Sequence, residues 1–217
     1  MFHPWLKNLR REFLVMAGFL LLLTGCATAH KNAADLVDVK AYVPGVVLDI
    51  RYATTNNFTG QQLYPVARCC LRREAAERLR EVETELQPLG YKLKIFDGYR
   101  PLSVQKRMWA IYPHPGFVAD PAKGSRHNRG AAVDLTLIRL DGSDVPTPTP
   151  FDDFTERAHR GYMHLPTEAI QNRELLQRVM TKHGFTGLPT EWWHFDLNNW
   201  REYPIMDVDY SQIKAVQ

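Results

Sequence analysis

The chain has 217 residues, of which 45% are hydrophobic and 24% are charged, and this is the composition of an ordinary globular protein. At this length a single domain is expected. The formal net charge is only +3, and basic residues do not gather with aromatic residues in any stretch, so nucleic acid is not an expected partner. The sequence shows no internal repeat and no low-complexity run.

The N-terminus has the order of an export signal. Basic residues come first, the apolar run Phe13–Leu23 follows, and the residues Leu-Thr-Gly-Cys end at Cys26. The apolar run is short for a membrane span and has the length of a signal-peptide core. Its ending resembles the lipobox of bacterial lipoproteins, in which the cysteine is lipidated and becomes the first residue. We therefore expect residues 1–25 to be a lipoprotein signal peptide, with a plain signal peptide or an uncleaved anchor as the alternative.

This N-terminus predicts an exported protein that is anchored to a membrane through lipidated Cys26. Ala27 follows the cysteine, which resembles the outer-membrane sorting rule of diderm bacteria, so the periplasmic face of the outer membrane is the expected location. The small and polar residues 26–39 predict a tether, and residues 40–217 predict the folded domain.

The rest of the chain predicts strands mixed irregularly with helices. Alternating hydrophobicity predicts strands at residues 45–54, 91–99, 131–140 and 190–197. Apolar residues at helical spacing predict helices at residues 71–86, 103–112 and 167–183, the second of them capped by Ser103. This mixture favours an α+β fold, a single domain with a central antiparallel sheet flanked by helices.

Cys69 and Cys70 are adjacent, at the expected start of the first helix. A disulfide between neighbouring cysteines closes a strained ring, so we expect two unbridged thiols. No Cys-x-x-Cys spacing occurs, and neither cysteine is an expected metal ligand.

His127, Asp134 and His194 together offer two imidazole nitrogens and one carboxylate. Catalytic zinc sites use three such ligands and keep a fourth position for water, whose pKa the metal lowers. The reaction then needs a general base close to that water, and Glu191 is the candidate. On an ideal strand Glu191 and His194 would face opposite ways, so a bulge or bend between them is required. The spacing alone leaves open that His127 is a surface or capping histidine and His194 a buried one.

The sequence around these residues resembles a known family. Ser125–Asp134 reads SRHNRGAAVD and fits SxHxxGxAxD, and Glu191–His194 reads EWWH and fits ExxH. Together these motifs resemble the zinc D-alanyl-D-alanine dipeptidases of the vancomycin-resistance type, within the wider group of zinc D,D-peptidases. The segments IRYATTNNFTG, FDGYRP, DLTLIRLDG and FDDFTERAH are similar to that family in the same order. The resemblance extends from about Val47 to Pro204.

The resemblance implies a zinc D,D-peptidase-like fold and one zinc ion per chain, held by His127, Asp134 and His194. It implies that Glu191 is the general base. It also implies that Arg100 steadies the tetrahedral intermediate, as a fixed guanidinium beside a developing oxyanion does best in a dry site. A structural salt bridge between Arg100 and a neighbouring aspartate, Asp97, is the alternative.

The resemblance also implies contacts to the substrate. Asp152 matches the acid that holds the free ammonium of the substrate, with the neighbouring Asp153 as the alternative, and Tyr52 and Ser125 match substrate-contacting positions. Trp192 and Trp193 are interpreted as pocket wall and core. Three further histidines, His114, His159 and His164, match no ligand position.

The implied activity is zinc-dependent hydrolysis of the dipeptide D-alanyl-D-alanine. Because the chain is expected to be exported, turnover or scavenging of cell-wall peptides is the expected role. One alternative is a D,D-carboxypeptidase or endopeptidase acting on peptidoglycan stem peptides. Another is a non-catalytic, wall-binding lipoprotein, against which Glu191 and Arg100 argue, because neither is needed to hold zinc. The sequence does not indicate an oligomeric state.

Overall fold

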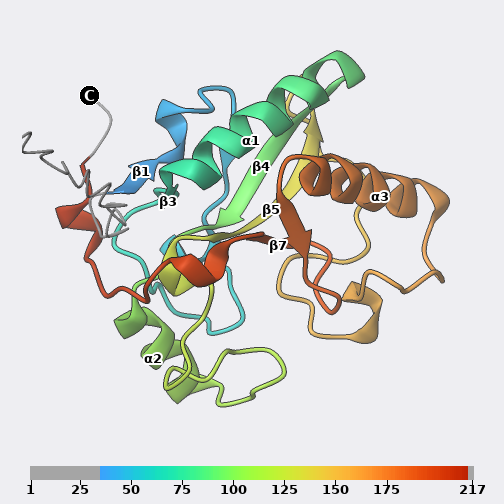
Figure 1. Ribbon diagram of the computed structural model, residues 1–217. Coiled ribbons are helices and arrows are strands. Elements are labelled where there is room, and N and C mark those ends of the chain that lie inside the picture. The colour runs from blue at the N-terminus through green and yellow to red at the C-terminus, as the bar shows by residue number, and fades with distance from the viewer. Residues whose placement is uncertain (1–34, 215–217) are drawn as a thin grey trace, which may run out of the picture. The chain divides into compact units, whose positions relative to one another are not determined.

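Figure 1 shows the computed structural model, which describes residues 35–214. The expected signal peptide and the lipidation site at Cys26 lie outside the described residues. Of the helices within residues 35–214, none has the length and apolar character needed to cross a membrane.

A five-stranded sheet forms the centre of the domain, in the order β2-β4-β5-β7-β6. These strands are β2 (Val47–Leu48), β4 (Tyr91–Asp97), β5 (Ala132–Arg139), β7 (His194–Leu197) and β6 (Phe185–Gly187). The pairs are antiparallel except β2 with β4, which is parallel. The predicted α+β class is therefore confirmed, but the sheet is mixed rather than wholly antiparallel.

A second, two-stranded sheet pairs β1 (Leu36–Asp38) with β3 (Cys70–Arg72) in antiparallel register. β1 lies in the segment predicted as a tether, and Leu36 and Val39 are both buried. The tether boundary at residue 39 was therefore wrong, because apolar side chains inside this polar stretch join the core. Cys69 and Cys70 are buried free thiols, as predicted, although Cys70 belongs to a strand and not to a helix.

Two of the helices cover the same side of the sheet. In Figure 1, α1 (Arg73–Leu86) and α3 (Thr167–Lys182) lie against the central strands, and they contact each other. Each turns apolar residues at helical spacing toward the core: Ala75, Ala76, Leu79, Val82 and Leu86 from α1, and Ala169, Leu176, Val179 and Met180 from α3.

The third helix, α2 (Leu102–Ile111), lies beyond the end of β4 (Figure 1). Its N-cap is Pro101, and no side chain of the cap residue bonds to the helix. The predicted cap by Ser103 was wrong: the Ser103 amide donates to Asp207 Oδ1 at 2.7 Å. A carboxylate from the C-terminal segment thus caps this helix, which no local pattern could indicate.

Two predicted strands are shorter than expected. After β2, residues Arg51–Ala53 form a 3-10 turn. The Tyr52 carbonyl in this turn accepts from the amides of Leu63 and Tyr64, both at 2.8 Å, and closes a loop. Residues 190–193 form a turn, and β7 begins only at His194.

The register of the sheet brings polar residues together at one end. Asp134 on β5 is paired with His194 on β7 and, across a bulge in β4, with Asp97. β5 is buried along its length up to its last residue, so Asp134 is held in the interior of the domain. The sheet therefore places two of the predicted metal ligands side by side.

Candidate active site

His127 is positioned by the loop that precedes β5. It opens the 3-10 turn His127–Arg129, and Gly130 ends that turn with a φ of 67°. A Cβ on Gly130 would lie 2.6 Å from Leu36 Cδ2, so the left-handed backbone and the tight packing both require glycine here. The Arg100 amide donates to the His127 carbonyl at 3.1 Å and ties the turn to the end of β4.

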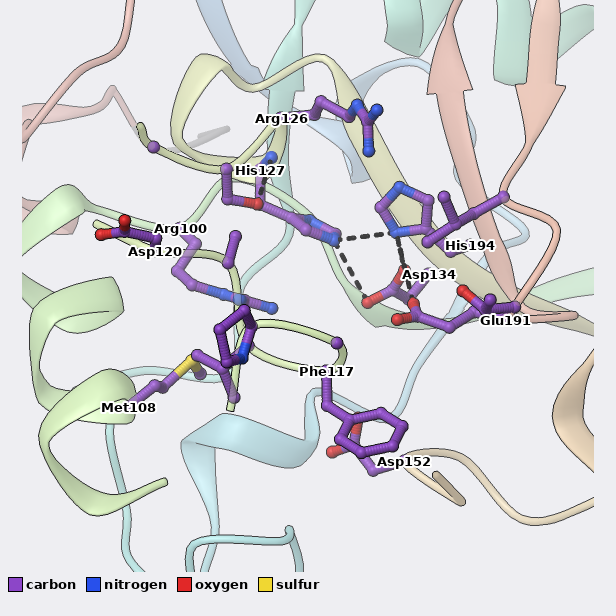
Figure 2. A pocket seen from close by; sticks show the side chains of 18 of the residues that line it. Arg100, Met108, Phe117, Asp120, Arg126, His127, Asp134, Asp152, Glu191 and His194 are labelled. Atoms are coloured by element: carbon purple, nitrogen blue, oxygen red, sulfur yellow. Dashed lines mark hydrogen bonds and ion pairs between the residues drawn. The ribbon is translucent and has the colours of Figure 1, made fainter. Parts of the chain in front are cut away.

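The three predicted ligands converge on one point. His127, Asp134 and His194 each offer one ligand atom, these atoms lie within 4.8 Å of one another, and all three residues are buried. His127 Nε2 is 3.2 Å from His194 Nδ1, and His194 Nδ1 is 2.9 Å from Asp134 Oδ1. Figure 2 shows the two rings and the carboxylate turned toward one another. These donors and their close arrangement suit a metal ion with tetrahedral coordination.

The outer nitrogen of each histidine also has a partner. His127 Nδ1 is 2.8 Å from the Gly98 carbonyl, and His194 Nε2 is 2.9 Å from Asp196 Oδ1. When these outer nitrogens carry the protons and donate, the inner nitrogens are unprotonated. Their lone pairs are then free to bind a metal ion together with the Asp134 carboxylate. A Cβ on Gly98 would lie 2.6 Å from Cys69 Sγ, so glycine lets this backbone approach β3 closely. The surroundings thus select the tautomers that suit metal binding.

The carboxylates around His194 favour its protonated, positively charged form, and a bound metal ion would take the place of that proton. Burial acts to raise the pKa of Asp134, but His127 and His194 outweigh it and keep this pKa below its usual value. Burial acts to lower the pKa of His194, but hydrogen bonds to Asp134 and Asp196 outweigh it and raise the pKa to about 10. The cluster therefore favours positive charge at its centre, which a divalent cation supplies.

Glu191 lies next to this cluster because the chain turns before β7. The His194 amide donates to the Glu191 carbonyl at 3.4 Å, and Glu191 Oε2 is 3.9 Å from His194 Nδ1. The bend that the sequence required between these two residues is therefore present. Burial raises the pKa of Glu191 against the lowering effect of His194, which suits a group that accepts and returns a proton.

Arg100 forms a salt bridge and also lines the pocket. Its Nη2 is 2.7 Å from Asp97 Oδ2, and its Nη1 donates to Gln105 Oε1 at 2.9 Å, so the salt bridge to Asp97 exists. Arg100 also lines the pocket, and these partners hold the guanidinium in one direction. Burial acts to lower the pKa of Arg100, but Asp97 outweighs it, so the side chain stays charged.

Asp152, and not Asp153, lines the same pocket. The Tyr52 hydroxyl donates to Asp152 Oδ2 at 3.0 Å, and Asp153 Oδ1 instead accepts from the Thr155 amide at 2.9 Å on the exposed side. Asp152 has a φ of 61°, a strained conformation that aspartate tolerates better than most residues. Burial, followed by the charge of Asp134, raises the pKa of Asp152 well above its usual value.

The remaining predicted residues divide between pocket and core. Ser125 lines the pocket, and its Oγ accepts from the His127 amide at 3.2 Å. Trp193 lines the pocket, whereas Trp192 is buried and its Nε1 donates to Thr149 Oγ1 at 2.9 Å. His114, His159 and His164 are not among the residues that line the pocket.

Asp196 and Arg126 were missed by the sequence reasoning. Asp196 follows His194 by two residues on β7, so strand alternation places both on one face, and this signal was available in the sequence. Arg126 was hidden among the variable positions of the SxHxxGxAxD motif. Its Nε lies 3.2 Å from Asp196 Oδ2.

The pocket has a volume of ≈ 520 Å³ and holds the donor cluster, Glu191, Arg100 and Asp152 together. In Figure 2, Arg126 and Asp152 lie on opposite sides of the cluster. Two histidines and a carboxylate beside a basic glutamate and a fixed arginine define a candidate metallohydrolase centre.

Comparison with known proteins identifies the family. The family model described as D-ala-D-ala dipeptidase matches residues 32–213, and the chain belongs to this peptidase family. It is 37% identical over 180 residues to the D-alanyl-D-alanine dipeptidase of Escherichia coli (strain K12), covering 83% of this chain and 93% of that protein. It is 34% identical over 189 residues to the D-alanyl-D-alanine dipeptidase of Enterococcus faecium, covering 77% of this chain and 93% of that protein.

Among solved structures, the chain is similar to a vancomycin resistance D,D-pentapeptidase in complex with Zn(II). The sequence identity is 16% and the TM-score 0.38, and the similarity covers 61% of this chain and 75% of that chain.

Proposed function

We propose that this protein is a zinc-dependent dipeptidase that hydrolyses D-alanyl-D-alanine. The observation that carries the proposal is the placement of Glu191 and Asp152 in one pocket with the three convergent donors His127, Asp134 and His194. Relatives over most of the chain bear the name of this activity. Metal-dependent hydrolysis of a dipeptide needs a metal site, a general base and a group that binds the substrate, and this pocket contains residues for each.

One zinc ion per chain fits the donor set. Two imidazoles and one carboxylate with fixed tautomers are the ligands of catalytic zinc sites that keep one position open. When bound, zinc lowers the pKa of water and polarises the scissile carbonyl.

Glu191 acts as the general base of the proposed reaction. Its carboxylate takes a proton from the water that attacks the scissile carbonyl and passes this proton to the amine that leaves. Its raised pKa brings it closer to the pH at which the reaction runs, which favours transfer in both directions. Its exposed side-chain fraction of 17% leaves it in reach of the pocket.

Arg100 stabilises the negative charge that develops on the carbonyl oxygen. A guanidinium already oriented by Asp97 and Gln105 does not have to reorganise when this charge appears. Removal of water from a buried site strengthens the interaction further.

Asp152 binds the free ammonium of the dipeptide. The carboxylate is partly buried, and because burial raises its pKa, a neighbouring positive charge would stabilise its ionised form. Tyr52 holds it in place through the hydroxyl hydrogen bond, and Ser125 borders the pocket near His127. A substrate without a free N-terminus leaves this carboxylate unpaired, so recognition of the ammonium favours a dipeptidase over a carboxypeptidase.

The cellular role that we propose is turnover or scavenging of cell-wall dipeptides outside the cytoplasm. It rests on residues 1–26 of the sequence, which have the order of a lipoprotein signal and end at Cys26. Globomycin or Cys26→Ser should leave an unprocessed or unlipidated chain. Recovery of the natural protein from the cytosol with Met1 intact would contradict this role.

The proposed activity is tested by offering the purified full chain three substrates: D-alanyl-D-alanine, its N-acetylated form, and a stem pentapeptide that ends in D-alanyl-D-alanine. We expect cleavage of the free dipeptide alone. Cleavage of the pentapeptide would indicate a carboxypeptidase. A zinc-loaded protein that cleaves none of the three would support a non-catalytic, wall-binding lipoprotein.

A further inference from the structure

We propose that Arg126 binds the C-terminal carboxylate of the dipeptide and so determines specificity for a free C-terminus. The inference rests on the proposed function and extends it to the other end of the substrate. It assigns a role to a residue that lies at a variable position of the SxHxxGxAxD motif.

Arg126 has a fixed place beside the donor cluster. It directly precedes His127 and lines the pocket. Its Nε lies 3.2 Å from Asp196 Oδ2, and its Cζ lies 5.0 Å from the centre of the Trp200 ring. Asp196 and the indole therefore hold the guanidinium at the pocket while 38% of the side chain remains exposed.

The donor groups of Arg126 are available to a ligand. Among the residues 35–214, no hydrogen bond is formed by the two terminal nitrogens of its guanidinium. The other arginines of the pocket are engaged: Arg100 donates to Asp97 and Gln105, and Arg129 Nη1 donates to the Tyr203 carbonyl. A planar guanidinium with two adjacent free N–H groups matches the two oxygens of a carboxylate.

The charges of the pocket are arranged for a zwitterion. The carboxyl group of Asp152 lies on one side of the donor cluster, and the guanidinium of Arg126 lies on the other (Figure 2). A free dipeptide carries an ammonium at one end and a carboxylate at the other, with the scissile bond between them. When Asp152 binds the ammonium and the scissile carbonyl lies at the cluster, the carboxylate points toward the side of Arg126.

Asp196 connects Arg126 to the proposed metal ligand His194, because it contacts both residues. Asp196 Oδ1 is 2.9 Å from His194 Nε2, and Asp196 Oδ2 forms the ion pair with Arg126. A change at Arg126 could therefore lower activity by disturbing the metal site. Zinc content has to be measured on each variant, and the decisive quantity is a preference between two substrates.

The experiment compares kcat/KM for D-alanyl-D-alanine and for its C-terminal amide, which lacks only the carboxylate charge. In the wild type we expect the free acid to be preferred. In Arg126→Gln we expect kcat/KM for the acid to fall about 10- to 100-fold, as for loss of a hydrogen bond to a charged group, with little change for the amide. Arg126→Lys, which keeps the charge, should recover part of the preference.

Two further variants serve as controls. Arg201 lies 4.3 Å over the same Trp200 ring but is not among the residues that line the pocket, so Arg201→Gln should keep the acid preference. Asp196→Asn keeps the guanidinium but weakens the support of His194. Because Asp196 also pairs with Arg126, this variant should lower zinc affinity and, in zinc-saturated enzyme, reduce the acid preference less than Arg126→Gln does.

Equal loss of both substrates in fully metallated Arg126→Gln, or an unchanged acid preference in that variant, would overturn the assignment of Arg126 while the dipeptidase activity stands. A zinc-loaded wild type that hydrolyses neither substrate would overturn the proposed function, and the assignment with it.

Discussion

Glu191 and His194 lie close together because the chain turns between them, although the sequence pattern predicted a continuous strand. The His194 amide donates to the Glu191 carbonyl at 3.4 Å, and Glu191 Oε2 lies 3.9 Å from His194 Nδ1. On a regular strand these side chains would point to opposite faces. The turn places a carboxylate within reach of whatever His194 binds, without making it one of the three convergent donors.

Replacement of this glutamate separates a base from a ligand. Glu191→Gln keeps the shape of the side chain and removes its basicity. We expect the variant to retain zinc and to bind substrate, while kcat falls by about 10²- to 10⁴-fold, the usual range for a general base. Zinc content and turnover are measured on the same preparation.

Other results from Glu191→Gln would assign other roles. Release of zinc with lower thermal stability would make Glu191 a ligand. A 10- to 100-fold drop in metal affinity with a mild loss of rate at saturating zinc would make it a support of His194. A fully metallated variant with near wild-type turnover would remove Glu191 from the mechanism.

The donor cluster predicts one zinc ion per chain. His127→Ala should lose most of the metal, because two remaining ligands hold zinc poorly. Elemental analysis of the wild type, His127→Ala and the variant with alanine at all three donor positions checks this. His159, which lies outside the pocket, provides the matched control in His159→Ala. Stoichiometric zinc in the triple variant would show that the metal binds elsewhere.

We expect Asp196 to affect metal affinity although it is not one of the three proposed metal ligands. Its Oδ1 lies 2.9 Å from His194 Nε2 and fixes the orientation of the ring. Asp196→Asn should weaken zinc binding by about 10- to 100-fold, as is typical for partners of metal-bound histidines. Competition with a chelator of known affinity measures this. An unchanged zinc affinity would mean that the backbone alone orients His194.

Asp152 predicts that substrate binding depends on pH. Its pKa is raised, so at pH values below this pKa the carboxyl group is neutral and cannot pair with the ammonium of the dipeptide. As pH rises through this pKa, Asp152 ionises and KM should fall. KM should rise again when the ammonium of the substrate loses its proton, near the usual α-amino pKa of about 8.

Asp152→Asn should remove the acidic part of this pH dependence and lower kcat/KM for the dipeptide by about 10- to 100-fold. Asp153→Asn is the matched control, because Asp153 bonds to the Thr155 amide and not to the pocket. An Asp152→Asn enzyme with the wild-type pH profile of KM would exclude Asp152 as the ammonium partner.

Local patterns predicted the elements whose sequence has a clear period. α1, α3, β4 and β5 lie where helical or alternating spacing placed them. The patterns failed where distant contacts decide the backbone. The turn before His194 forms where the Trp192 amide donates to the Ala158 carbonyl and the Trp193 carbonyl accepts from the Leu135 amide, and neither partner is close in sequence.

The sequence predicted more of the site residues correctly than of the backbone around them. The donor set His127, Asp134 and His194 was identified, and the structure brings the three together. Local patterns left Asp153 as an alternative to Asp152, because the two are adjacent in the chain and the pocket is formed by segments distant in sequence, of which Asp152 is a lining residue. Arg126 was missed because its significance comes from Asp196, which is distant in sequence and adjacent only through the pairing of β5 with β7.

The most direct test of a metal-dependent dipeptidase is a titration of the chelator-treated full chain with zinc. Hydrolysis of D-alanyl-D-alanine and bound zinc are measured at each step. The proposed site predicts no hydrolysis without metal and recovery that levels off at about one equivalent of zinc per chain, because three convergent ligands serve one ion. Full hydrolysis by the metal-free chain, or recovery that His127→Ala does not impair, would contradict the account.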